Sequence, residues 1–206
     1  KGILNALGLP GPGVNQFLNE VQYSELWKFK RPLGISIGGD NKNEYINNIE
    51  RIENTLKEDQ IDYFYELNIS CPNTKSGSTI CQSPELLESL LFQLRHFLGR
   101  VISIKVSPDV SNETLLKIGE VVSSFEKIII NAGNTKYVSP IEVNVDASNF
   151  SMTGGGLSGA PIFARTLEMV HLFSNFNVPI MATGGISNID QVNAAKSSGA
   201  SLFGIA

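Results

Sequence analysis

The chain of 206 residues is 42% hydrophobic and 17% charged, which is typical of a globular protein with one sizeable core. Its net charge of −4 comes without a basic cluster, so nucleic acid and anionic membranes are not expected partners. The sequence has no long apolar run and no signal-peptide pattern, and we therefore expect a cytoplasmic protein without a membrane segment. The two cysteines, Cys71 and Cys81, are expected to remain thiols in that compartment.

The first part of the chain predicts two helices and one strand. Residues 1–15 are rich in glycine and proline, which excludes a regular helix there. A short amphipathic helix is predicted over 14–27, and a strand over 33–37 follows it. Large apolar residues recur at spacings of four, three and four within 42–57, which predicts a helix capped by Asp40.

The segment from Glu66 to Thr74 is the one around which the other polar groups are expected to gather. An apolar run from Ile61 to Ile69 leads into it and predicts a buried strand over 63–69. Pro72 has no N–H and disfavours a helical conformation at Cys71, so the strand ends there. A thiol and two asparagines thus stand where a strand meets its loop.

Strands and helices alternate through the rest of the chain. A helix is predicted to begin at Ser83-Pro84 and to end at Gly99, with a stripe of leucines facing the core. The stretch between 131 and 159 is glycine-rich, with a small hairpin expected around 141–145. The other strands are predicted over 101–106, 127–131, 178–182 and 201–205, and the other helices over 112–125, 161–174 and 189–197.

This alternation predicts parallel βα units in a single domain over 1–206, either an open doubly wound sheet or a (β/α)8 TIM barrel. In a barrel the carboxyl ends of the strands surround one mouth, whereas an open sheet spreads them along an edge. We favour the α/β barrel, with its first two strands absent from this chain, because polar groups follow several strand ends. They are Asn68 with Cys71, Lys105, Asn134, and Gly184 with Gly185.

Two kinds of group at these strand ends predict a bound ligand. Lys105 shares one side of its strand with Ser103, and an ammonium that faces a barrel interior is costly unless it meets an anion or an electron-rich ligand. The alternative is a lysine that extends to solvent. Thr183–Ile186 and Gly154–Gly159 are glycine-rich and precede helices, where backbone N–H groups suit a phosphate. The alternative interpretation of both is a flexible loop.

Asparagines predict a small, planar, polar ligand such as a pyrimidine, because amides both donate and accept hydrogen bonds. Asn131 is left out of this set and assigned to turn formation or capping. Cys71 is either a proton acceptor at the mouth of a site or a small buried residue. Neither histidine has metal-like neighbours, so no metal site is expected. The asparagines in the set are Asn5, Asn68, Asn73 and Asn134.

The segment Asn68–Thr74 resembles the active-site signature of the dihydroorotate dehydrogenases. The resemblance extends over essentially the whole chain, with the motifs in the family's order. The further segments are similar to the family's substrate loop (Asn5–Pro10), its flavin-contacting lysine strand (Ile104–Val106), its second substrate pair (Asn134-Thr135) and its phosphate loops (Gly155–Gly159 and Thr183–Ile186).

The resemblance implies an FMN-binding barrel that oxidises dihydroorotate to orotate in pyrimidine (UMP) biosynthesis. In the family a cysteine base marks class 1, so Cys71 would remove the C5 proton while FMN accepts the C6 hydride. Lys105 would stabilise negative charge on the reduced flavin. The implied substrate-binding residues are Asn5, Ala6, Leu7, Gly8, Leu9, Asn68, Asn73, Asn134 and Thr135. The implied flavin-binding residues are Ser36, Asn68, Lys105, Gly133, Gly159, Gly184 and Gly185.

We also expect a homodimer that binds a small-molecule pyrimidine. Two alternatives stay open: a related flavin barrel that acts on another pyrimidine, like dihydropyrimidine dehydrogenase, and a folded barrel fragment without activity. The residues do not distinguish fumarate, NAD through a partner subunit, or quinone as the electron acceptor.

Overall fold

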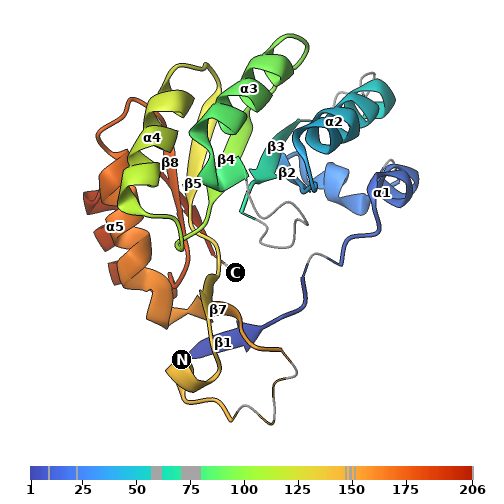
Figure 1. Cartoon of the computed structure of the whole chain (residues 1–206). Helices are drawn as coiled ribbons and strands as arrows, with labels where there is room; N and C mark the ends of the chain where they lie inside the picture. The colour runs from blue at the N-terminus through green and yellow to red at the C-terminus, as the bar shows by residue number, and fades with distance from the viewer. Residues whose placement is uncertain are drawn as a thin grey trace.

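The computed structural model describes residues 1–8, 10–21, 23–56, 62–70, 80–146, 148, 150 and 152–205. A curled, six-stranded parallel sheet in the order β2-β3-β4-β5-β8-β9 forms its centre (Figure 1). The strands are β2 (Leu33–Ile37), β3 (Tyr63–Asn68), β4 (Ile102–Val106), β5 (Ile128–Ala132), β8 (Ile180–Thr183) and β9 (Leu202–Gly204). The predicted series of parallel strands is therefore confirmed.

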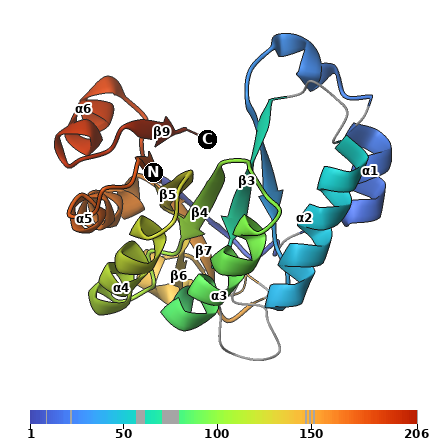
Figure 2. The same cartoon turned by 90° about the horizontal axis from the view of Figure 1, so that it is seen from above.

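Helices cover one face of this sheet and form an arc around it (Figure 2). Alternate strand residues face them: Ile102, Ile104 and Val106 of β4 are fully buried in the main core. The predicted leucine stripe and the spaced apolar residues of 42–57 are buried in the same core. The helices are α1 (Val14–Val21), α2 (Lys42–Leu56), α3 (Pro84–Arg95), α4 (Asn112–Ser123), α5 (Phe163–Phe173) and α6 (Ile189–Ser197).

A second, three-stranded antiparallel sheet lies at the carboxyl end of the parallel strands. Its order is β1-β7-β6, with β1 (Gly2–Asn5), β7 (Gly155–Gly159) and β6 (Lys136–Val138). Because β6 follows directly after β5, the small sheet lies beyond the end of β5, where Figure 1 shows β1 and β7. The described residues also form short 3₁₀ helices, among them Glu25–Phe29, Ile80–Gln82, Ile141–Val143 and Ala160–Ile162.

The small sheet corrects two predictions. The stretch expected to form a hairpin around 141–145 contains a 3₁₀ helix, Ile141–Val143, and the hairpin is instead formed by β6 and β7. Gly154–Gly159, predicted as a loop, is mostly the strand β7, and β1 was not predicted at all. Glycine weakens a strand in general, so its sequence pattern predicts loops. Here it permits close packing, because a β-carbon on Gly155 would lie 2.4 Å from the carbonyl oxygen of Asn5.

Helix starts and ends were predicted less accurately than the core faces. The helix expected over 14–27 ends at Val21, and a 3₁₀ helix capped by Ser24 follows it. The cap of α2 is Asn41 rather than Asp40, since the Asn41 side chain accepts the N–H of Glu44 at 3.2 Å. Ser83 and Ser111 cap α3 and α4, as their positions before the two predicted helices favour. Among the residues described, no helix has both the length and the apolar composition needed to cross a bilayer.

Candidate active site

Polar side chains on the face of the parallel sheet away from the helices form the candidate site. Alternation along the strands puts Glu66 and Asn68 of β3, Lys105 of β4 and Asn131 of β5 on this face. The register places Asn68 beside Lys105 and Lys105 beside Asn131. Residues remote in sequence are thus aligned across three neighbouring strands near their carboxyl ends.

Lys105 has an anionic partner within the protein. Its Nζ lies 3.6 Å from Oε1 of Glu66, and both side chains are largely shielded, at 25% and 18% exposure. Asn131 donates from Nδ2 to the other carboxylate oxygen of Glu66 at 2.8 Å. The assignment of Asn131 to turn formation or capping is therefore wrong. Glu66 was missed, although its position two residues before Asn68 places it on the same strand face.

A second group of predicted residues lies between the parallel sheet and the small sheet. Asn134 donates from Nδ2 to Oδ1 of Asn68 at 3.3 Å, and its own Oδ1 accepts the N–H of Thr135 at 2.9 Å. Asn5 donates to the carbonyl oxygen of Gly156 at 3.3 Å. A β-carbon on Gly156 would lie 2.3 Å from Oγ1 of Thr135. Asn5 and Thr135 are therefore both neighbours of Gly156.

The end of β3 is fixed on two sides. The Ser70 hydroxyl donates to the carbonyl oxygen of Lys105 at 2.9 Å, and the buried Tyr45 hydroxyl donates to the carbonyl oxygen of Asn68 at 2.8 Å. The chain therefore enters the predicted cysteine loop from beside Lys105. Three predicted site residues, Cys71, Asn73 and Leu9, lie outside the described residues.

The other cysteine has a structural environment. Cys81 is a free thiol at 1% exposure, and its burial raises its pKa. A buried thiol of this kind is a poor nucleophile or base. Cys81 is therefore a buried part of the main core.

Three of the predicted phosphate-binding glycines come together at the start of α5. Gly159, Gly184 and Gly185 all have positive φ, at 86°, 128° and 73°. A β-carbon on Gly185 would lie 2.8 Å from the carbonyl oxygen of Gly159 and 3.0 Å from the backbone nitrogen of Phe163. Exposed backbone at a helix N-terminus favours an anion, so this cradle suits a phosphate. Nearby, Thr183 Oγ1 is buried and has no hydrogen-bond partner among the described residues.

The remaining predicted residues are at the edges of the site. Ser36 is an exposed residue of β2 in register with Glu66. Ala6, Leu7 and Gly8 are exposed and follow β1. Within the described part of the chain, no three His, Cys, Asp or Glu side chains are grouped as metal ligands.

Gly133 has a packing role in addition to any contact with a ligand. Its φ is 155°, and a β-carbon there would lie 1.4 Å from the carbonyl oxygen of Thr183. We expect Gly133→Ala to lower the free energy of unfolding by about 3 kcal/mol, from the combined backbone strain and overpacking. Urea denaturation followed by circular dichroism would measure this loss.

Gly99→Ala is the matched control, because a β-carbon at Gly99 meets nothing within 4 Å. It is expected to leave the stability unchanged or to raise it by up to about 1 kcal/mol. Equal stabilities of the two variants would contradict the close approach of the β5 and β8 ends.

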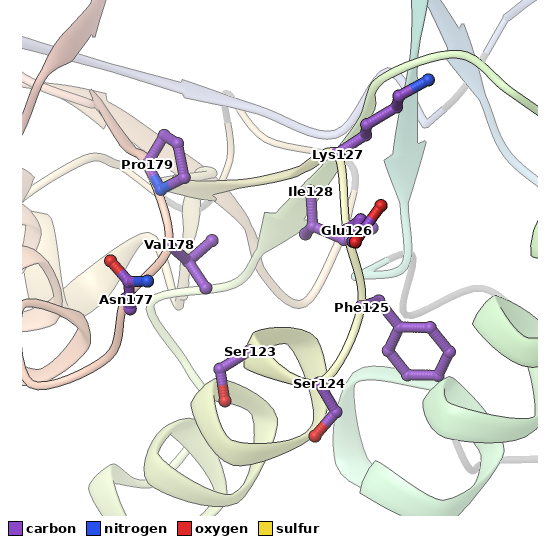
Figure 3. Close-up of a pocket in the computed structure, with 9 residues that line it drawn as sticks. All are labelled: Ser123, Ser124, Phe125, Glu126, Lys127, Ile128, Asn177, Val178 and Pro179. Atoms are coloured by element: carbon purple, nitrogen blue, oxygen red, sulfur yellow. The ribbon is translucent and has the colours of Figure 1, made fainter.

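A cavity of about 330 Å³ lies away from this site (Figure 3). It is formed by the segments that precede β5 and β8, and so lies at the amino end of the parallel strands. In barrel enzymes the chemistry is located at the carboxyl end of the strands, so this cavity is not the candidate site. Its lining residues are Ser123, Ser124, Phe125, Glu126, Lys127, Ile128, Asn177, Val178 and Pro179.

Comparison with known proteins identifies related sequences over the whole chain. The family model described as dihydroorotate dehydrogenase matches residues 1–206. The catalytic subunit of dihydroorotate dehydrogenase B (NAD(+)) from Lachnoclostridium phytofermentans is 30% identical over 99% of this chain and 66% of its own length. Dihydroorotate dehydrogenase (quinone) from Acinetobacter baylyi is 30% identical over 100% of this chain and 63% of its own length.

A solved structure shows the same fold. The crystal structure of DHODH in complex with ferulenol from Eimeria tenella superposes with a TM-score of 0.78 at 22% sequence identity. The match covers 100% of this chain and 61% of that one, so this chain forms part of an α/β barrel of the TIM type. The chain likewise spans slightly less than two thirds of the curated relatives above, 66% and 63% of their lengths.

Proposed function

Because the chain belongs to the dihydroorotate dehydrogenase family, we propose that the full-length protein binds FMN and oxidises dihydroorotate to orotate in pyrimidine biosynthesis. The observation that supports this most directly is the alignment of Lys105, Asn68 and Asn134 at one end of the sheet. A cationic group and amides on one face suit a flavin next to a planar, polar substrate.

The residues present fit FMN at its phosphate end. The cradle of Gly159, Gly184 and Gly185 offers backbone without side chains at the start of α5, and that end of a helix favours a phosphate. Gly133 and Ser36 are proposed to lie along the cofactor. When bound, FMN supplies the hydride acceptor for C6 of the substrate. Lys105 would supply positive charge beside it.

The substrate is proposed to be held by amides and by the segment after β1. Asn68, Asn73, Asn134 and Thr135 would bind the pyrimidine and its carboxylate, and Asn5 would do so from the small sheet. Backbone groups of residues 6–9 would add to this. Cys71 would take the C5 proton, the role that a cysteine has in class 1. The cytoplasmic location and the homodimer stay predictions.

The experiment is a titration of the full-length protein with FMN, followed by anaerobic addition of dihydroorotate. Saturable FMN binding and bleaching of the flavin absorbance by dihydroorotate are expected. Oxidation of the reduced protein by uracil, without reduction by dihydroorotate, would instead favour the dihydropyrimidine dehydrogenase-like alternative. A folded protein that binds no FMN would contradict the proposal and favour a barrel without activity.

A further inference from the structure

Asp109 lies outside the proposed site but contacts a strand that helps to form it. It belongs to the loop that follows β4, the strand of Lys105. Both of its carboxylate oxygens accept the N–H of Tyr137, at 3.2 and 3.0 Å. Tyr137 is in β6, two residues after Thr135. One carboxylate therefore connects the parallel sheet to the small sheet at the point where the small sheet begins.

The loop that carries Asp109 is itself held in place. Within the loop, the N–H of Asp109 donates to Ser107 Oγ at 3.1 Å, and that hydroxyl donates to the carboxylate at 3.2 Å. From α5, Arg165 donates to the carbonyl oxygens of Pro108 at 3.0 Å and Val110 at 2.6 Å, the two neighbours of Asp109. A guanidinium presents several donors in a rigid, planar arrangement, so these two bonds fix the loop geometry.

Arg165 has further partners that hold its own position. It lies 2.7 Å from Oε2 of Glu168 and donates to Oδ1 of Asn112 at 2.6 Å. Asn112 in turn donates to Glu168 at 2.7 Å. The Arg165 side chain is only 19% exposed. A shielded guanidinium with four partners from two helices and a loop is a better anchor than an exposed surface ion pair.

Strand pairing links Tyr137 to the residues that are proposed to bind substrate. Tyr137 pairs with Gly156 in β7, and Gly156 pairs on its other side with Asn5 in β1. The carbonyl oxygen of Gly156 also accepts the Asn5 side chain. Thr135 also lies next to Gly156, because a β-carbon on Gly156 would be 2.3 Å from the Thr135 hydroxyl oxygen. A shift of β6 would therefore displace both Asn5 and Thr135.

We propose that Asp109, held by Arg165, is a positioning residue that sets the β1-β7-β6 sheet relative to the barrel and thereby places Asn5 and Thr135 on the substrate. This role rests on the proposed function, because it is expressed through binding of orotate or dihydroorotate. The FMN cradle depends on this contact only through Gly159, the last residue of β7, because Gly184 and Gly185 belong to the loop after β8.

The test compares Asp109→Asn and Asp109→Ala in the full-length protein. Asp109→Ala is expected to raise the orotate dissociation constant about tenfold, as the loss of a hydrogen bond to a charged acceptor does. Asp109→Asn keeps one acceptor oxygen and should raise it about threefold. The FMN dissociation constant should rise by less than the orotate dissociation constant, because Gly184 and Gly185 lie outside the small sheet. Amide hydrogen exchange should become faster in β6 and β7 but not in β4 or β5.

Glu113→Gln is the control, because it removes an exposed carboxylate on α4 that contacts only Lys117 among the described bonds. It should change none of these values. Normal orotate affinity in Asp109→Ala would overturn the positioning role, as would weaker FMN binding with faster exchange throughout, which indicates general destabilisation. Failure of the proposed function would give a different result. The unsubstituted protein would then bind no orotate, whatever the rate of amide hydrogen exchange in β6.

Discussion

Cys71→Ala is expected to slow flavin reduction by dihydroorotate about 10²- to 10⁴-fold, the usual contribution of a general base. Alanine cannot accept the C5 proton, and water is a much weaker base at neutral pH. FMN binding should be retained, because the substitution removes only a thiol and leaves the glycine cradle and Lys105 in the protein. Anaerobic stopped-flow measurement of the flavin absorbance would give the reduction rate.

Two variants make this result specific to Cys71. Cys71→Ser replaces the thiol by a hydroxyl, which is a weaker proton acceptor. The reduction rate of this variant should therefore lie between those of the alanine variant and the unsubstituted protein. Cys81→Ala removes the buried thiol and should leave the reduction rate within about twofold, because that thiol is desolvated within the main core. A full rate in Cys71→Ala would refute the base assignment.

The alternation of apolar and polar residues along each segment predicted the parallel sheet well. The apolar residues of β4 alternate with Ser103 and Lys105, and the structure buries the first set under the helices. Serine caps such as Ser83 also act within one turn of helix, so they are readable from neighbouring residues. The family resemblance was confirmed by the match over the whole chain.

Contacts between distant segments could not be predicted in the same way. β1 pairs with β7, although more than half of the chain separates them, and both strands contain glycines that locally favour a loop. The role of Asn131 depends on Glu66, which is on another strand, and nothing near Asn131 in the sequence indicates it. The sequence of β4 alone also indicates that Lys105 is a cation without a partner. In the structure its partner is the carboxylate of Glu66 on β3.

That carboxylate determines what removal of the lysine should do. Lys105→Ala would leave Glu66 with only the amide of Asn131 as a described partner, on the face proposed for the flavin. An unpaired negative charge there opposes negative charge on the reduced cofactor. We expect the flavin midpoint potential to fall and its reduction by dihydroorotate to slow about 10²- to 10³-fold. Spectroelectrochemical titration would measure the potential, and stopped-flow absorbance the rate.

The double variant Lys105→Ala/Glu66→Gln separates the two charges. Glutamine can still accept from Asn131 but carries no charge, so part of the lost potential and rate should return. Lys117→Ala is the matched control, since it removes the lysine of an exposed Lys–Glu pair at 2.8 Å and should change neither quantity. If the double variant were no better than Lys105→Ala, Glu66 would have no electrostatic effect on the flavin. If the potential of Lys105→Ala were unchanged, Lys105 would not stabilise the reduced cofactor.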